Sequence, residues 1–234
     1  MNQAVLSDSL LALPLGGMCN LKDQFIGNSD QSNVPLIVMN QTHSNVWSHI
    51  EFNQDGLQLI SSNKEHVQNN AKNGIFKPQV CHQNADPFSR VGSIYELDSD
   101  AVITSSKNVI LSVKTADCLP ILIKADPFIA VIHAGRVGTL DSITKNVMIF
   151  LKKQGVNFVN VWYGPHSCVC CYEIDQETNT HFDLLLNNTD QIKSVFGSSY
   201  LINYANYCTQ CHSNLFYSYR SGDEFKRNVF YLKK

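Results

Sequence analysis

Four short apolar runs, close together in the middle of the chain, constrain the fold more than any other feature of the sequence. They cover residues 100–104, 109–113, 119–124 and 128–132. Runs of this length, bounded by turn-forming residues, are typical of β-strands. The tripeptide Ala125-Asp126-Pro127 is turn-like, so the last two runs are predicted to be neighbouring strands joined by a tight turn.

The second half of the chain mixes helical and strand-like patterns. Residues 139–153 show helical spacing of their apolar side chains and end before Gly155, a common stop signal. A second helix is predicted at 180–196, and further strands are predicted at 156–163, 200–204, 215–219 and 228–232. Strands and helices mixed in this way predict an α+β fold, in which mixed β-sheets pack against helices.

The length of the chain and one shift in its composition bear on its domain organisation. Its 234 residues suffice for one large domain or two small ones. Residues from 53 to about 97 are rich in Asn, Gln, Ser and Lys and show little hydrophobic periodicity. A stretch of this kind buries little apolar surface, so we expect a polar insertion on the surface at about 53–97.

Charge and hydropathy argue against two classes of partner. The formal net charge is -2 and no basic run is present, which is not typical of a nucleic-acid-binding protein. No apolar stretch approaches the roughly 20 residues that a membrane-spanning helix needs. The N-terminus has no basic residue before its short apolar run and is a poor match to a signal peptide. We expect a cytoplasmic protein with no nucleic-acid or membrane partner, and the sequence leaves its oligomeric state open.

The cysteine content is high for a cytoplasmic protein. The eight cysteines are Cys19, Cys81, Cys118, Cys168, Cys170, Cys171, Cys208 and Cys211. Thiols in the cytosol are kept reduced, so a disulfide framework is not expected without an export signal. Metal binding or catalysis then explains a cysteine that lies within a recognisable motif better than a disulfide does.

Three polar residues stand at the edges of strand-like runs. His43 follows the apolar run PLIVM, Cys118 precedes the third run, and His133 ends the fourth. Side chains at such strand ends can converge, and two imidazoles with one thiolate make a three-ligand set suited to zinc. Copper would accept the same ligands. Asp117, beside the thiolate, is a candidate partner of a ligand or a proton shuttle.

Two other interpretations of these residues remain open. A single buried His or Cys is more often a structural residue of the core. Cys118 could also act as the nucleophile of a metal-free cysteine hydrolase with His133 as its base, because that pairing needs only hydrogen-bond contact.

A second cysteine motif lies near the C-terminus, in the segment CTQCH from Cys208 to His212. The pattern matches c-type haem attachment, which takes place after export and is not expected here. A zinc knuckle needs a second cysteine pair at similar spacing, and Cys168, Cys170 and Cys171 offer only an irregular group. We therefore interpret the motif as a structural or incidental pair.

Two further segments are candidates for substrate contacts. The loop 164–173, rich in cysteine, follows a predicted strand and either borders a binding site or forms a turn with small buried thiols. Arg220 follows alternating aromatic residues and could hold a phosphate or a carboxylate, although an arginine at a strand end is more often simply exposed.

Taken together, six segments in order resemble the YfiH-like family, also called the multicopper polyphenol oxidase or laccase-domain family. The matching segments are Gln41-Thr-His43, Asp100-Ala-Val-Ile-Thr104, Thr115-Ala-Asp-Cys-Leu-Pro120, His133-Ala-Gly135 with Gly138-Thr139, Gly164-Pro165 with Cys170-Cys-Tyr-Glu173, and Cys208-Thr209 with Ser218-Tyr-Arg220. Each segment alone is a weak signal, but the ordered series is specific and extends from Gln41 to the end of the chain, apart from the polar insertion.

The resemblance implies a fold and an activity. It implies a single YfiH-like domain over 1–234, a metal held by His43, Cys118 and His133, and phosphorolysis of purine nucleosides such as adenosine, inosine and guanosine. Methylthioadenosine cleavage and adenosine deamination are related activities. The expected small-molecule partners are a purine nucleoside and phosphate, and the expected cofactor is zinc, with copper as the alternative. Asp117 and Cys118 are candidate catalytic residues, and the candidate substrate- or phosphate-binding residues are Gln41, Arg136, Cys171, Tyr172 and Arg220.

This chain departs from the family pattern at several points. Arg136-Val137 replaces the Trp-Arg that follows His-Ala-Gly in the family, and His166-Ser-Cys-Val169 replaces a stretch like Ala-Ile-Gly-Pro. Metal binding tolerates these changes better than a specific activity does. The alternatives are therefore a laccase-like copper polyphenol oxidase, a metal-free cysteine hydrolase, and a catalytically degenerate nucleoside-binding protein.

Overall fold

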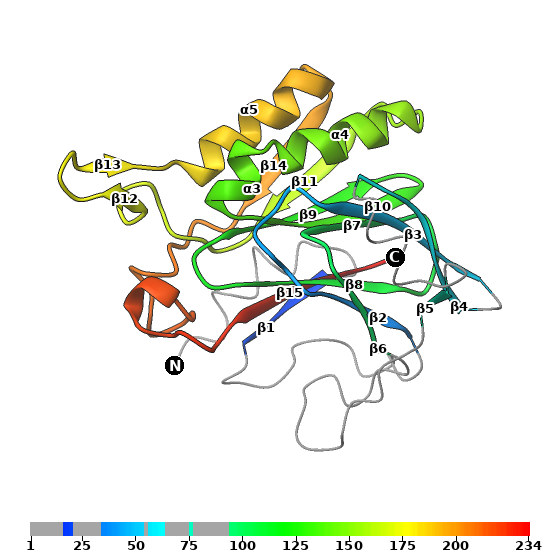
Figure 1. Ribbon diagram of the computed structural model, residues 1–234. Helices are drawn as coiled ribbons and strands as arrows, with labels where there is room; N and C mark the ends of the chain where they lie inside the picture. The colour runs from blue at the N-terminus through cyan, green and yellow to red at the C-terminus, as the bar shows by residue number, and fades with distance from the viewer. Residues whose placement is uncertain (1–15, 21–33, 54–55, 64–74, 77–93) are drawn as a thin grey trace.

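The computed structural model describes residues 16–20, 34–53, 56–63, 75–76 and 94–234 (Figure 1). Two mixed sheets carry most of the described strands, and the helices within these described residues come from the second half of the chain. The strands are β1 (Gly16–Asn20), β2 (Leu36–Met39), β3 (Trp47–Asn53), β4 (Gly56–Ser62), β5 (Ile75–Phe76), β6 (Ile94–Leu97), β7 (Ala101–Thr104), β8 (Ile110–Thr115), β9 (Leu119–Ala125), β10 (Phe128–Ala134), β11 (Val159–Tyr163), β12 (Glu173–Asp175), β13 (Thr180–His181), β14 (Tyr200–Tyr204) and β15 (Asn228–Lys233). The helices are α3 (Arg136–Leu140), α4 (Ile143–Lys153), α5 (Leu184–Phe196) and the 3-10 helix η1 (Tyr219–Ser221).

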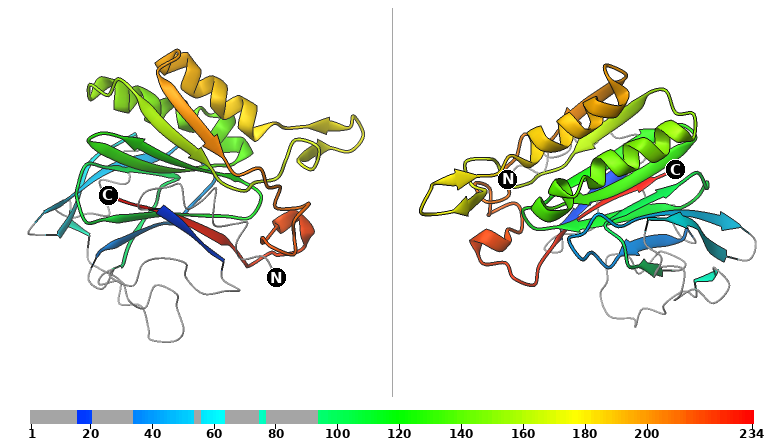
Figure 2. Two further views of the ribbon diagram at one scale, coloured as in Figure 1. Left: turned by 180° about the vertical axis from the view of Figure 1, so that it is seen from behind. Right: turned by 45° about the horizontal axis from the view of Figure 1, so that its top comes forward.

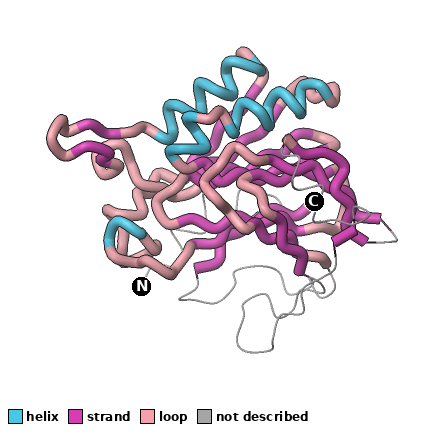
Figure 3. Tube along the Cα trace, in the orientation of Figure 1, coloured by secondary structure: helices cyan, strands magenta, loops and turns pink. Residues whose placement is uncertain are grey.

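The elements form three layers (Figure 2). Helices α3, α4 and α5 cover one face of an eight-stranded sheet with the order β14-β11-β9-β10-β7-β3-β4-β5. A five-stranded sheet with the order β1-β15-β8-β2-β6 lies against the opposite face. The β12–β13 hairpin projects beyond the layers (Figure 3).

The central sheet is buried on both faces, which explains its continuous apolar runs. In β9, Ile121 and Ile123 pack in the core beneath the helices, whereas Leu122 packs in the core between the two sheets. In β10, Ile132 faces the helices and Val131 faces the five-stranded sheet. Successive strand residues point to opposite faces, so both faces demand apolar side chains.

The predicted α+β fold class is confirmed, as are the four strands of the middle segment and the turn between the last two. The prediction of one continuous helix at 139–153 is wrong, because two helices lie there: α3 ends at Leu140 and α4 begins at Ile143. Between them Ser142 adopts a left-handed conformation with φ of 64°, which interrupts the helical path. The helix predicted at 180–196 begins only at Leu184, where the carboxylate of Asp183 caps it by accepting from the amide of Leu186 at 2.8 Å.

The strand predicted at 215–219 is wrong. This segment forms turns that lead into η1. The side chain of Asn228 accepts from the amide of Tyr217 at 3.0 Å and donates to its carbonyl at 2.8 Å, taking the place of a neighbouring strand. Phe216 and Tyr217 are buried by tertiary packing, and their alternation with polar neighbours imitates a strand pattern.

The segment expected as a polar insertion contributes strands at its two ends. β4 pairs antiparallel with β3, and β6 pairs parallel with β2. The middle of the segment, 64–74 and 77–93, lies outside the described residues. The single domain over 1–234 stays a prediction. Within the described part of the chain, none of the helices has the length and apolar character required to cross a membrane.

Candidate metal centre

The strand register brings the three predicted ligands to one end of the eight-stranded sheet. Strands β9 and β10 pair antiparallel with His133 opposite Pro120, so Cys118, which immediately precedes β9, comes close to the end of β10. Strand β7 pairs with both β10 and β3, and the loop that carries His43 leads into β3. Residues far apart in the sequence therefore meet because their strands are neighbours.

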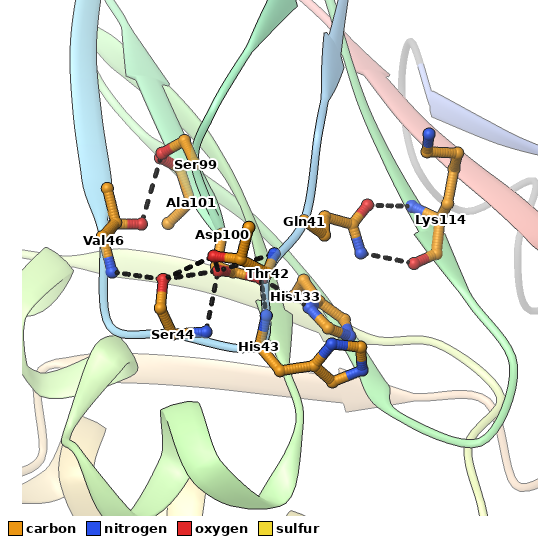
Figure 4. A network of polar contacts seen from close by, with 10 residues as sticks. All are labelled: Gln41, Thr42, His43, Ser44, Val46, Ser99, Asp100, Ala101, Lys114 and His133. Carbon is orange, nitrogen blue, oxygen red and sulfur yellow. Dashed lines mark hydrogen bonds and ion pairs between the residues drawn. The ribbon is translucent and has the colours of Figure 1, made fainter. Parts of the chain in front are cut away.

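The three side chains form a compact group. One ligand atom from each of His43, Cys118 and His133 lies within 4.8 Å of the others. The two imidazole rings stand edge to face with centroids 4.6 Å apart (Figure 4). His133 is buried, Cys118 is partly exposed and His43 is exposed, so the group is open on the side of His43. Two imidazoles and one thiol in this arrangement suit zinc or copper and leave room for a further ligand.

A buried carboxylate fixes two of these residues. Asp100 is fully buried, and its Oδ1 lies 2.8 Å from Nδ1 of His133 and accepts from the amide of His43 at 3.1 Å. Its Oδ2 accepts from the amide of Ser44 at 2.8 Å and from the Ser44 hydroxyl at 2.6 Å (Figure 4). Since a carboxylate can only accept, His133 donates its Nδ1 proton to Asp100, which leaves Nε2 as the ring nitrogen that can bind a metal once it has lost its own proton.

Electrostatics favours the thiolate form of Cys118. Burial opposes ionisation of the thiol, but the charge and hydrogen bond of His133, supported by His43, outweigh it and lower the pKa of Cys118 to about 6. Burial likewise opposes protonation of His133, but the Cys118 thiolate and the hydrogen bond to Asp100 raise its pKa to about 9. Hydrogen bonds from His133 and Ser44 overcome burial and lower the pKa of Asp100 to about 2. The group is thus poised to present a thiolate.

The backbone around the group is held in uncommon conformations. His43 has φ of 58° and Asp117 has φ of 85°, both in the left-handed region that non-glycine residues rarely occupy. Such conformations persist only where surrounding contacts enforce them, and they concentrate at functional sites. Here the contacts are those of Asp100 with the amide of His43, and those of the Asp117 side chain described below.

Gly135 leaves the space that the group needs. A Cβ atom at this position would lie 3.2 Å from Sγ of Cys118 and 3.2 Å from Cδ2 of His43. Contacts this short require both side chains to shift by a few tenths of an ångström. The glycine that follows His133-Ala134 is therefore required by the close approach of two candidate ligands.

Replacing Gly135 with alanine is expected to weaken metal binding at the group by about 10-fold or more, in the range seen when the support of a ligand is removed. The extra methyl group displaces Cys118 and His43 while leaving every ligand chemically intact. Competition with a zinc chelator, followed by titration, measures the affinity. Val137→Ala, an exposed change in the short helix α3 that Gly135 precedes, is the matched control. Equal affinities in the two variants would contradict the role of Gly135.

Asp117 connects the group to the C-terminal region. Its Oδ1 accepts from the hydroxyl of Thr209 at 2.6 Å, its Oδ2 accepts from the amide of Arg220 at 2.8 Å, and its carbonyl accepts from the amide of Ser167 at 2.9 Å. Both carboxylate oxygens of this buried residue are therefore engaged by the protein. Asp117 holds three separate segments beside Cys118.

Tyr172 and both candidate arginines lie near the group. The guanidinium of Arg220 is 4.3 Å from the ring centre of Tyr172. The pKa of Tyr172 is raised, first by burial and then by the charge of Cys118, while Arg220 and the backbone amide of Arg136 act in the opposite direction. The Tyr172 hydroxyl therefore stays protonated at neutral pH. Within the described residues, Arg220 forms no ion pair with a carboxylate, and both arginine side chains are exposed.

Two of the expected substrate-binding residues have other contacts. Gln41 donates from Nε2 to the carbonyl of Lys114 at 2.6 Å and accepts at Oε1 from its amide at 2.9 Å, which anchors the loop before His43 to β8 (Figure 4). Cys171 lies in a separate group with Cys168, Cys208 and Cys211, called here the thiol cluster. The CTQCH cysteines, interpreted from the sequence as a structural or incidental pair, lie in this cluster together with Cys168 and Cys171, a second pair at the same spacing.

The sequence indicates Asp100, which supports the candidate group, only as part of a family motif and gives it no separate role. A carboxylate at the start of an otherwise apolar strand nevertheless must have partners when it is buried. That signal was present in the segment Asp100-Ala-Val-Ile-Thr104. Its partners, however, lie on a loop more than fifty residues earlier and on the end of β10, and only the fold reveals them.

Comparison with known proteins places the chain in a family. The family model described as multi-copper polyphenol oxidoreductase laccase matches residues 26–198. A purine nucleoside phosphorylase of Clostridium acetobutylicum is 37% identical over 92 residues, which cover 37% of this chain and 39% of that protein. A purine nucleoside phosphorylase of Borreliella burgdorferi is 31% identical over 146 residues, which cover 53% of this chain and 63% of that protein. The chain thus spans about two to three fifths of the length of these relatives.

Solved structures share the fold. A crystal structure of a Neisseria meningitidis protein has a TM-score of 0.57 and 19% identity, covering 86% of this chain and 76% of that one. An identity this low shows the fold alone, whereas the family model extends over most of the sequence and includes His43, Cys118 and His133. The chain therefore belongs to the multi-copper polyphenol oxidoreductase laccase family, the YfiH-like family that its motifs resemble.

Proposed function

We propose that this chain is a metal-dependent purine nucleoside phosphorylase in which His43, Cys118 and His133 bind zinc. The observation that carries the proposal is the group itself, with its thiolate, its two imidazoles and the carboxylate of Asp100 behind His133. Relatives named purine nucleoside phosphorylase, which match the chain over part of their length, support the choice of reaction. A zinc ion bound there would supply Lewis acidity to an oxygen of the substrate or of a bound water.

The reaction transfers a ribosyl group to phosphate. An oxygen of inorganic phosphate forms a bond to the anomeric carbon, the bond from that carbon to the purine nitrogen breaks, and the purine leaves with the bonding electrons and then takes up a proton. The protein must therefore hold an anion beside the sugar and supply a hydrogen-bond donor near the departing purine.

Arg220 and Tyr172 have the chemistry for these two tasks. The guanidinium of Arg220 is exposed, stacked on Tyr172 and not engaged by any described carboxylate, so it is available to bind phosphate by paired hydrogen bonds. The hydroxyl of Tyr172 stays protonated at neutral pH because its pKa is raised, and it can donate to the substrate. Asp117 acts as a positioning residue in this proposal instead of a proton shuttle, because Thr209 and Arg220 already occupy its oxygens.

Among the described residues, only two groups of side chains could hold a metal ion, namely the group of His43, Cys118 and His133 and the thiol cluster. Laccase chemistry normally uses several coppers with many histidines, and neither group provides such a set. This favours nucleoside phosphorolysis over polyphenol oxidation. Adenosine deamination at the same group is the second candidate, because a metal-activated water there could attack the purine ring.

Incubating the zinc-loaded protein with inosine or adenosine, with and without phosphate, tests the function. We expect phosphate-dependent release of hypoxanthine or adenine together with ribose 1-phosphate, measured by liquid chromatography. Formation of inosine from adenosine without phosphate would identify deamination. No base release above that of Cys118→Ala would overturn the phosphorylase proposal.

Replacing Arg220 with glutamine is expected to raise the KM for phosphate by about 10- to 100-fold, since a hydrogen bond to a charged group contributes about 1.5–3 kcal/mol. The KM for the nucleoside should change much less. Arg227→Gln is the matched control, because the Arg227 guanidinium donates to backbone carbonyls of Glu224 and Lys226. Arg136→Gln tests the other candidate. If Arg136→Gln raises the KM for phosphate and Arg220→Gln does not, the phosphate contact belongs to Arg136.

A further inference from the structure

The thiol cluster lies on two segments that run side by side. Strands β11 and β14 pair in parallel, and the chain continues from each of them in the same direction (Figure 1). An isolated bridge joins His166 to Cys208 beyond the ends of these strands. Cys168 and Cys171 follow on the first segment, and Cys208 and Cys211 lie on the second. The Sγ atoms of all four lie within 4.8 Å of one another.

Each segment places its two cysteines on one tight turn. The amide of Cys171 donates to the carbonyl of Cys168 at 2.9 Å. In the other segment, the amide of Cys211 donates to Sγ of Cys208 at 3.4 Å, and the amide of Cys168 reaches the same sulfur at 3.3 Å. Backbone amides that point at a sulfur stabilise its thiolate form. The two turns thus present four sulfurs toward a common centre.

We propose that Cys168, Cys171, Cys208 and Cys211 form a second metal site, which binds one zinc ion through four thiolates and joins the two segments. This site is separate from the proposed phosphorylase centre of His43, Cys118 and His133, and the two sites share no ligand. Two C-x-x-C pairs separated along the chain are a ligand pattern typical of structural zinc sites.

The spacing of the sulfurs suits a single tetrahedral metal ion such as zinc. In a tetrahedral site with Zn–S bonds of about 2.3 Å, neighbouring sulfurs lie roughly 3.8 Å apart. The Sγ atoms of Cys171 and Cys211 are 3.4 Å apart, and the others fall within the 4.8 Å limit, so small movements complete a tetrahedron. A four-iron cluster would hold its cysteine sulfurs farther apart. Two disulfides are the competing arrangement, but they require S–S bonds of about 2.05 Å and an oxidant.

Cys170 lies beside the site without belonging to it. Its Sγ is 3.1 Å from that of Cys168, but it is exposed and is not among the four sulfurs that converge. It therefore offers a control cysteine within the same loop.

The proposed site lies next to the substrate-facing residues of the first one. Ser167 and Thr209, which neighbour Cys168 and Cys208 in sequence, both donate to Asp117, and Tyr172 directly follows Cys171. A zinc ion that joins the two segments would therefore hold Tyr172 and the contacts of Asp117 in place beside Cys118. The structural ion would act by positioning, and no substrate would contact it.

Metal analysis of the full chain, purified under reducing conditions and dialysed against zinc, tests the proposal. We expect two zinc ions per chain in the wild-type protein and one each in Cys118→Ala and Cys211→Ser. The control Cys170→Ser should keep two. X-ray absorption of zinc-loaded Cys118→Ala should show four sulfur ligands, and this measurement does not depend on the folding of Cys211→Ser.

Two results would overturn the second site. One is a single zinc ion in the wild-type protein that is lost completely in Cys118→Ala. The other concerns the mass of the fully zinc-loaded protein, measured under non-reducing conditions. A polypeptide mass about 4 Da below that of the reduced protein would show two disulfides, because each disulfide removes two hydrogen atoms. Metal content is measured without reference to catalysis, so failure of the phosphorylase proposal would leave this test intact.

Discussion

Replacing Cys118 with alanine is expected to lower kcat/KM for nucleoside phosphorolysis by more than about 100-fold. Loss of an outer partner of a metal ligand typically costs 10- to 100-fold, and loss of the ligand itself exceeds that. Cys118 provides the only thiol of its group, and its thiolate is favoured by His133 and His43. Initial rates of phosphate-dependent base release from inosine, measured at several substrate concentrations, give the change.

The matched control for this prediction is Cys170→Ser. Cys170 is an exposed thiol outside both candidate metal groups, so its replacement should change kcat/KM by less than the variation between preparations. If Cys118→Ala kept wild-type activity, neither a metal bound by Cys118 nor a cysteine nucleophile could explain the reaction. If Cys118→Ala were inactive but the wild-type protein were inhibited by added zinc, the metal-free cysteine hydrolase would be the better explanation.

Replacing Asp100 with alanine is expected to lower the free energy of unfolding by about 3–5 kcal/mol, the range for removing one partner of a buried charged pair. The change would leave the amides of Thr42, His43 and Ser44 and the ring of His133 without their acceptor. For a protein of this size, that loss corresponds to a decrease in Tm of about 6–20 °C. Thermal denaturation followed by circular dichroism measures it.

A conservative variant separates stability from ligand positioning. Asp100→Asn keeps an oxygen that can accept from His133 but removes the negative charge, so it should restore part of the stability and still weaken metal binding by about 10-fold or more. Asp98→Ala is the matched control, because Asp98 is exposed and its carboxylate accepts from the side chain of Asn40 at 2.9 Å on the surface. A Tm for Asp100→Ala equal to that of Asp98→Ala would contradict the structural role of Asp100.

The strands of the central sheet were predictable because their residues obey a local rule. Both faces of β9 and β10 are buried, so the runs are apolar throughout and end at turn-forming residues. Where tertiary contacts replaced local hydrogen bonding, the sequence misled. The alternation around Tyr217 predicted a strand, but the side chain of Asn228 satisfies the backbone of that residue instead. Ser142 likewise interrupts a pattern that reads as one helix.

The residues of the candidate sites likewise fall into those that the sequence indicates and those that only the fold brings together. His43, Cys118 and His133 could be named from the sequence, because metal-binding residue types interrupt strand ends and match a family pattern. The thiol cluster could not be named from the sequence, because the additional Cys170 makes the C-x-x-C spacing of Cys168 and Cys171 look irregular. These two cysteines meet Cys208 and Cys211 only because β11 and β14 lie side by side.

The sequence by itself determined the apolar strands, the α+β class, the family motifs and the types of residue available as ligands. These properties depend on amino-acid composition and on the local pattern of neighbouring residues, both of which can be read from the sequence. Only the tertiary structure decided which of those residues meet. It assigned Asp100 to His133, turned the oxygens of Asp117 toward Thr209 and Arg220, and brought four cysteines together. Contacts between distant segments arise from strand order and register, and no local pattern encodes them.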